Sequence, residues 1–207
     1  MNKFQKMIIC LLSLAATSAI SQAGKFKTVI IDAGHGGKDN GGSYGRVYEK
    51  HLALDTALRV DYLLRKKGYR TRLTRKSDVF IPLSKRAAIA NSYSNSIFVS
   101  IHYNYTYNKE IHGLETFYYS SRSKPLASYI QSGMLKKYSA HNRGVKHARY
   151  AVLRKGENPS ALVECGFVSN YSERKRCMKG WYRHKMAEGI VDGIVKYQSA
   201  RSKGYVH

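Results

Sequence analysis

The sequence predicts a single α/β domain built around a largely parallel β-sheet. Short runs rich in β-branched residues alternate with amphipathic segments along the chain, which is typical of strands joined by helices. The 207 residues contain no internal repeat, no proline-rich linker and no second region of different composition. This length suits one domain with a sizeable core, and the hydrophobic fraction of 43% is ordinary for a globular protein.

The first half of the chain predicts two strands and one long helix. Residues 27–32 are β-branched and end at a glycine-rich stretch, so they predict a buried strand followed by a loop over 33–47. Apolar positions within 48–67 follow a helical period, and Gly68 is a typical helix stop. Residues 69–74 then alternate as a strand does.

The second half continues the alternation of helices and strands. A proline in its first turn and five apolar positions predict a helix over 82–93. The remaining expected elements are a buried strand at 96–101, a strand near an edge at 112–119, a helix at 123–138, short strands at 150–153 and 161–163, a final helix at 181–197 and a frayed tail at 199–207.

The amino terminus has the three parts of a secretory signal peptide. Lys3 and Lys6 precede an apolar run over 7–19, and small residues then place a cleavage site after Ala23. The run is too short for a comfortable membrane span, although an uncleaved anchor is the alternative. We therefore expect a signal peptide at 1–23, a catalytic domain at 24–200 and a basic tail at 201–207, in a protein exported to the periplasm or the extracellular space.

Charge and cysteine content add two constraints. Thirty-six Lys and Arg against thirteen Asp and Glu give a formal net charge of +23, which favours nucleic acid, anionic lipid or acidic wall polymer as a partner. The expected export and the lack of a nucleic-acid-binding motif argue against nucleic acid. Cys165 and Cys177 would remain after signal cleavage; an oxidising compartment permits a bridge between them, and burial of Cys165 as a small apolar residue is the default.

Three polar residues occupy positions where an α/β sheet gathers ligands. His35 lies between glycines just after the first expected strand, His102 follows a buried-type strand, and Glu49 begins the first helix. Two imidazoles and one carboxylate with a free fourth position are typical of catalytic zinc. The other histidines lie among polar neighbours, where solvent exposure is the simpler interpretation.

Glu164 stands in an apolar run, Ala161 to Phe167. A buried carboxylate is costly unless it is ligated, paired or held for proton transfer. It could therefore act as the general base of a metal-assisted hydrolysis, or form a salt bridge with one of the many arginines.

At this point the residues resemble a known family, the zinc-dependent N-acetylmuramoyl-L-alanine amidases with the type-3 catalytic domain. The matching runs are 30–39 (Ile-Ile-Asp-Ala-Gly-His-Gly-Gly-Lys-Asp), 48–50 (Tyr-Glu-Lys), 73–75 (Leu-Thr-Arg) with Asp78, Arg86, Ala90 and Asn91, 99–104 (Val-Ser-Ile-His-Tyr-Asn), 143–146 (Arg-Gly-Val-Lys), 152–154 (Val-Leu-Arg) and 159–170 (Pro-Ser-Ala-Leu-Val-Glu-Cys-Gly-Phe-Val-Ser-Asn). They keep the family's order and spacing over nearly the whole mature chain.

The resemblance implies one Zn²⁺ per chain on His35, Glu49 and His102, with Glu164 as the catalytic carboxylate. It implies hydrolysis of the amide between N-acetylmuramic acid and L-alanine in peptidoglycan, and a six-stranded sheet flanked by helices on both faces. A zinc peptidase cutting within the stem peptide, or a non-catalytic basic wall-binding or polyanion-binding protein, are the alternatives.

Further residues receive weaker expectations. Asp32 and Asn104 could orient the metal-binding imidazoles or be turn residues. Asn104, Arg143 and Arg154, with Lys146, could bind the substrate, although an arginine on so basic a chain could equally be a surface residue. Some amidases of this family carry a long inserted helix that covers the zinc; the segment between the His102 and Arg143 runs is short here, so we expect an uncovered site in a monomer.

Overall fold

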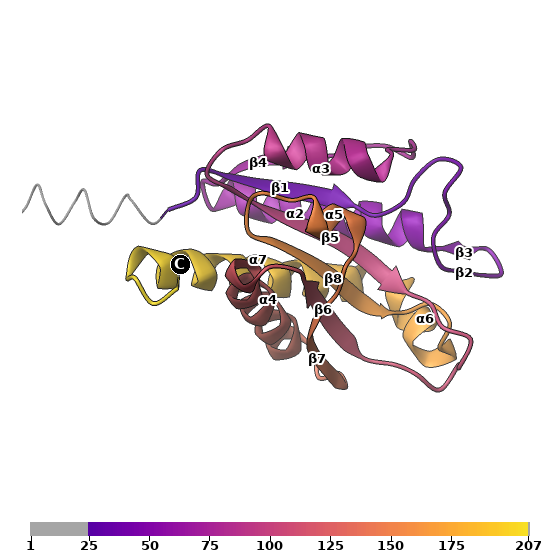
Figure 1. Ribbon diagram of the computed structural model, residues 1–207. Helices are drawn as coiled ribbons and strands as arrows, with labels where there is room; N and C mark the ends of the chain where they lie inside the picture. Colours follow the sequence, from indigo (N-terminus) through magenta and orange to yellow (C-terminus); the bar gives the residue numbers. More distant parts are fainter. Residues whose placement is uncertain (1–24, 207) are drawn as a thin grey trace, which may run out of the picture.

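A six-stranded sheet forms the centre of the structure, a computed structural model that describes residues 25–206 (Figure 1). The expected signal peptide at 1–23 lies outside the described residues. The strands are β1 (Thr28–Ala33), β4 (Arg70–Leu73), β5 (Ser96–Asn104), β6 (Leu114–Tyr118), β7 (Asn142–His147) and β8 (Ser160–Phe167), in the order β4-β1-β5-β8-β6-β7. Neighbours pair in parallel except β6 with β8, so the sheet is mostly parallel, as predicted.

Helices cover both faces of this sheet, but unequally. The long helices α2 (Glu49–Lys66) and α4 (Lys124–Lys137) both pack against α7 (Gly180–Ser202), and the three enclose the larger core. The short helices α3 (Leu83–Asn91) and α5 (Ala151–Arg154) contact each other over a smaller apolar cluster on the opposite face. The remaining elements are the hairpin β2 (Ser43–Tyr44) and β3 (Val47–Tyr48), the 3₁₀ turn η1 (Ser121–Ser123) and α6 (Tyr171–Cys177).

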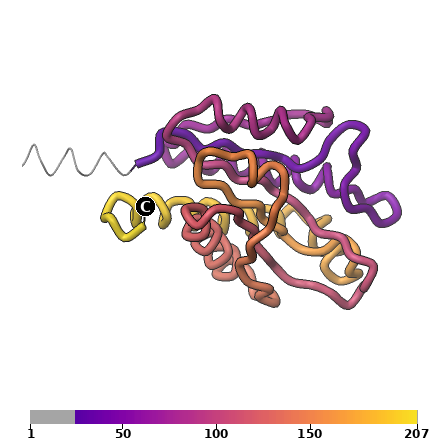
Figure 2. The backbone as a smooth tube through the Cα atoms, viewed as in Figure 1, coloured from indigo at the N-terminus to yellow at the C-terminus, as the bar shows by residue number. Residues whose placement is uncertain are grey.

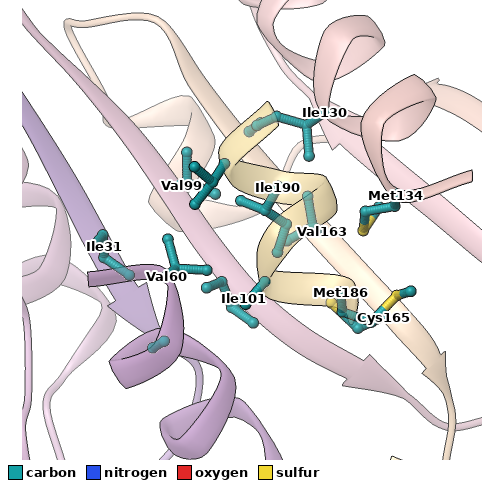
Figure 3. Close-up of a cluster of buried hydrophobic side chains, with 14 of the residues drawn as sticks. Ile31, Val60, Val99, Ile101, Ile130, Met134, Val163, Cys165, Met186 and Ile190 are labelled. Carbon is teal, nitrogen blue, oxygen red and sulfur yellow. The ribbon is translucent and has the colours of Figure 1, made fainter. Parts of the chain in front are cut away.

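Alternation along the strands decides which side chain reaches which face. Val99 and Ile101 of β5, with Val163 and Cys165 of β8, point into the larger core beneath α7 (Figure 3). The intervening positions belong to the opposite face because successive strand residues point to opposite sides. On that face, Phe98 and its neighbours lie under α3 and α5, whereas the positions nearer the strand ends carry polar residues.

The larger core includes a close approach of α4 and α7. A Cβ atom added to Gly189 would lie 2.5 Å from the Cα of Met134, so only glycine permits the two backbones to come this near. Both free cysteines, Cys165 and Cys177, are buried in this core, as expected for Cys165, and form no bridge with each other. No helix within residues 25–206 has the length and apolar character needed to cross a membrane.

Several predicted elements differ from the structure. The apolar run 150–153 was predicted as a strand and is the helix α5, because such a short run fits either structure. Strand β7 and helix α6 were not predicted: β7 is a polar edge strand containing Gly144, so it lacks the usual apolar alternation. Helix α7 continues to Ser202, through residues expected to fray.

Candidate metal and catalytic site

His35 reaches the site through an unusual backbone conformation. It follows β1 directly and has a φ of 58°, a left-handed value that is uncommon outside glycine. The preceding Gly34 lies against the ring of His102; a Cβ there would be 2.4 Å from that ring. The loop can therefore bring the two imidazoles together, with ring centroids 5.0 Å apart.

Glu49 joins the two histidines. Its Oε1 lies 2.7 Å from Nδ1 of His102 and its Oε2 lies 3.2 Å from Nε2 of His35. The backbone N–H groups of Gly42 and Tyr103 also donate to this carboxylate, at 2.7 and 3.1 Å. One ligand atom from each of His35, Glu49 and His102 lies within 4.8 Å of the others, so the three sequence candidates are brought together.

Hydrogen bonds behind the two rings fix which nitrogen faces the centre of this group. Nδ1 of His35 donates to Oδ2 of Asp39 at 2.8 Å, which leaves Nε2 facing Glu49. Nε2 of His102 lies 3.1 Å from Oγ of Ser100, which donates its own proton to Oδ2 of Asp32 at 2.6 Å. Such outer hydrogen bonds orient metal-binding imidazoles and set their tautomers.

Asp32 is held rigidly in turn. It is buried and accepts from Nη1 of Arg86 and Oγ1 of Thr74, at 2.8 and 2.7 Å. Arg86 also donates to the carbonyl of His35 at 2.6 Å, while Arg75 donates to that of Gly34 at 2.7 Å. Two arginines thus clamp the backbone that carries His35. Asp39, Ser100 and Arg75 received no role from the sequence, although all three lie in the family-like runs.

The charge balance of this cluster favours a cation at its centre. Burial would raise the pKa of Glu49, but hydrogen bonds from His102 and His35 and their charges lower it to about 2. Burial likewise opposes protonation of His35, yet Glu49 and Asp39 raise its pKa overall. A metal ion bound between these three side chains would balance the charge of the carboxylate, which fits the donor set of a zinc site.

Glu164 lies directly beside this cluster. It pairs with His102 across β5 and β8 and with Glu115 across β8 and β6, so all three side chains share the face of α3 and α5. Glu164 is 7% exposed, and its Oε2 has no hydrogen-bond partner among residues 25–206. Burial, with repulsion from Glu49 and Glu115, raises its pKa well above the usual range.

The sequence left open a salt bridge between Glu164 and an arginine. Glu164 forms no ion pair with any of the described residues.

The strand positions also differ slightly from expectation, because β5 and β8 continue beyond His102 and Glu164. Both residues therefore lie inside strands, close to their carboxyl ends, where hydrogen bonding on either side holds the backbone.

A second polar group surrounds Glu115, a residue that the sequence did not single out. This buried carboxylate accepts from Nδ2 of Asn104 at 2.7 Å, from Nε of Arg143 at 2.9 Å and from Nζ of Lys146 at 2.5 Å. Three of the weaker sequence candidates thus converge on one residue next to Glu164. Arg154 instead lies exposed at the end of α5. The sequence offered one signal for Glu115: a charged residue within the run 114–118, which was predicted to be a strand.

Similarity to known proteins agrees with this geometry. The profile of a family described as N-acetylmuramoyl-L-alanine amidase matches residues 29–196. This chain belongs to that family. Membership confirms the resemblance, the fold class and the prediction that the chain is a hydrolase.

Individual members of the amidase family match over most of the chain. N-acetylmuramoyl-L-alanine amidase LytC of Bacillus subtilis is 35% identical over 83% of this chain and 35% of its own length. Probable cell wall amidase LytH of Staphylococcus epidermidis is 31% identical over 85% of this chain and 60% of its own. This chain therefore spans only part of these two relatives.

A solved amidase structure matches more completely. The crystal structure of an N-acetylmuramoyl-L-alanine amidase from Clostridium difficile 630 has a TM-score of 0.82 and 36% identity, covering 85% of this chain and 98% of that one. In the present chain, the segment between Asn104 and Arg143 forms β6, η1 and α4. Helix α4 packs against α7, on the face of the sheet opposite to the metal cluster.

Proposed function

We propose that this chain is a zinc-dependent amidase that hydrolyses the bond between N-acetylmuramic acid and L-alanine in bacterial peptidoglycan. One arrangement carries the proposal: the convergence of His35, Glu49 and His102 beside a buried carboxylate with an unpartnered oxygen. Family membership supplies the class of bond, and the site supplies groups suited to its hydrolysis.

The residues would hold one Zn²⁺ per chain. Nε2 of His35, a carboxylate oxygen of Glu49 and Nδ1 of His102 are the donor atoms, because hydrogen bonds to Asp39 and Ser100 occupy the other ring nitrogens. Nitrogen and oxygen donors suit zinc, and three protein ligands leave one position free. When bound, the ion would polarise the substrate carbonyl and make a water molecule more acidic.

Glu164 would move the proton. Its free Oε2 can accept a proton from the attacking water and then give it to the nitrogen of the departing L-alanine. A neighbouring divalent cation would offset the burial that disfavours its charged form. The strand pairing with His102 fixes its position without help from a flexible side-chain contact.

The group around Glu115 would bind the peptide part of the substrate. Glu115 engages Nε of Arg143, which leaves the terminal nitrogens of this guanidinium to receive a carboxylate. Glu115 also accepts a hydrogen bond from Nδ2 of Asn104, which holds this side chain within the same group. Arg154, exposed at the end of α5, would act only on a longer portion of the stem peptide.

Export and wall binding complete the proposal. One relative is named an N-acetylmuramoyl-L-alanine amidase and another a probable cell wall amidase. The amino-terminal sequence of this chain has the pattern of a signal peptide. A net charge of +23 suits an acidic wall. Binding to purified sacculi should weaken steeply with salt; binding that is insensitive to salt would contradict this part.

Digestion of purified sacculi tests the reaction. Mass spectrometry should find intact stem peptides that begin with L-alanine, whereas shortened peptides still attached to sugar would indicate a stem-peptide peptidase. Metal analysis should find one zinc per chain. Glu164→Gln should retain zinc and lose turnover by at least a hundredfold, and a matched Glu157→Gln variant, at an exposed glutamate before the amino end of β8, should remain active.

A further inference from the structure

The end of the molecule opposite the metal cluster contains a basic cavity. It measures about 540 Å³ and is lined by Lys25, Lys27, Lys67 and Arg70, with Tyr69 and Gln198 among the other residues. Except for Gln198 of α7, these residues precede β1, follow α2 or begin β4, so they lie at the amino ends of the parallel strands. Figure 2 shows both ends of the described chain here, far from the β2–β3 hairpin.

Helix α7 brings further cations to the same end. Gln198 accepts from the backbone N–H of Phe26 at 3.2 Å, which ties the last turns of α7 to the start of β1. Lys196 and Lys203 line a second cavity, between the last turns of α7 and Tyr129 of α4, together with Tyr205. We call the six cations Lys25, Lys27, Lys67, Arg70, Lys196 and Lys203 the basic pole.

The charges of the basic pole are not balanced from within the protein. All six side chains are exposed, and none forms an ion pair with a carboxylate of residues 25–206. Asp61 on α2 is already engaged by Arg65 and Thr71. Some cations elsewhere are paired, for example Lys137 with Asp192, whereas every cation of the basic pole is available to an external anion.

Aromatic rings lie beneath and beside these cations. Phe26 stacks on Tyr69 and on Tyr197, with centroids 6.0 and 6.2 Å apart. Tyr205 is 76% exposed at the edge of the pole. Tyrosine and long basic side chains together are typical of surfaces at the level of lipid headgroups, where each has an apolar body and a polar tip.

We propose that the basic pole docks on the anionic phospholipid headgroups of a membrane. Free cations supply the attraction, and the exposed Tyr205 with the half-exposed Tyr69 suits the headgroup layer. The described chain also begins at this end, at Lys25 (Figure 2). Docking in this way points the metal cluster, at the carboxyl ends of the strands, away from the bilayer and towards the wall.

Vesicle binding tests the proposal independently of catalysis, because no substrate is present. The chain from Gly24 onward is suitable, since every strand and core residue lies within 25–206. It should bind vesicles of equimolar phosphatidylglycerol and phosphatidylcholine and not vesicles of phosphatidylcholine alone. The triple variant Lys27→Gln, Lys67→Gln, Arg70→Gln should bind about a hundredfold more weakly, since each cation near an anionic surface contributes roughly fivefold.

A matched variant distinguishes an effect of the basic pole from an effect of the protein's net charge on vesicle binding. Lys85→Gln, Lys136→Gln and Lys179→Gln remove the same charge from exposed, unpaired positions on α3, on α4 and before α7. This variant should keep most of the binding. Equal losses in the two variants would overturn the proposal, and so would a failure of the parent chain to bind either type of vesicle. The proposal would also be overturned if the triple variant of the basic pole lost binding to polyphosphate and kept its binding to vesicles.

Fluorescence tests the orientation. Trp181, the single tryptophan, begins α7 at the far end, and the 23 residues of this helix span about 34 Å. Brominated lipids should leave its emission unchanged and should quench a tryptophan introduced by Tyr205→Trp in a Trp181→Phe background. Quenching of Trp181 instead would place the wrong end on the membrane.

Discussion

Replacing Glu164 with glutamine should stabilise the metal-free protein while removing its activity. The carboxyl group is buried between Glu49 and Glu115, and both burial and their charge raise its pKa. Folding therefore requires Glu164 to stay protonated at pH values where the unfolded chain would release the proton. Glutamine keeps the shape of the side chain and has no charge to neutralise.

The size of this effect follows from proton linkage. With an unfolded-state pKa of 4.5, keeping the carboxyl protonated costs at most about 3.4 kcal/mol at pH 7. Because Oε2 of Glu164 is buried without a hydrogen-bond partner, we expect Glu164→Gln to raise the free energy of unfolding by about 1–3 kcal/mol at pH 7. For a domain of this size, each kcal/mol corresponds to a rise of about 2–4 °C in Tm.

The sign of the pH dependence is fixed as well. A raised native pKa contributes stability that is present below the unfolded-state pKa and is lost as the pH rises towards the native value. The two proteins should therefore match near pH 4, where both side chains are neutral, and Glu164→Gln should be increasingly more stable towards pH 7. Urea unfolding with a chelator present, at several pH values, measures this. A variant that is less stable at pH 7, or a difference that does not vary with pH, would refute the reasoning.

Three further changes probe the site and the core. Ser100→Ala removes the hydroxyl behind a metal-binding imidazole and should weaken zinc binding by about 10–100-fold in a chelator competition; the metal-free protein should lose about 1–3 kcal/mol in urea unfolding, because Asp32 loses one donor. Arg86→Met leaves Asp32 buried without its ion pair and should cost about 3–5 kcal/mol in urea unfolding; a cost below 1 kcal/mol would contradict this role. Gly189→Ala should destabilise by about 1–3 kcal/mol through overpacking, whereas Gly156→Ala, where a Cβ meets only ordinary contacts, should not.

The buried parallel strands and the long helices were predictable because their apolar periods are clear. Residues 29–31 and 97–99 are continuous apolar runs, and α2 has a helical stripe that ends near Gly68. The order of strands could not be deduced from such patterns, since pairing depends on contacts between distant segments. Neither could the antiparallel pairing of β6 with β8, which brings Glu115 beside Glu164.

Some residues of the site could likewise be predicted from the sequence, and others could not. His35 and His102 were visible because strand ends and glycines framed them, and Glu164 because it interrupted an apolar run. Of the residues that orient them, Asp32 was a candidate, whereas Ser100 and Asp39 were not, because serine and aspartate near a strand end are common as ordinary turn or strand residues. Ser100 acquires its position only when Asp32 of a neighbouring strand accepts its proton.

The alternation in β5 and β8 assigns adjacent residues to separate tasks. Ile101 and Val163 belong to the apolar interior, while their neighbours His102 and Glu164 belong to the hydrolytic centre. An insertion or deletion of one residue within either strand would exchange the two sets, placing a charged group among methyl groups and an aliphatic one beside the metal ligands. Natural variation in chain length should therefore accumulate between Asn104 and Leu114 and avoid these strands. Side chains of the interior, by contrast, can be repacked without altering the chemistry on the other side of the same backbone.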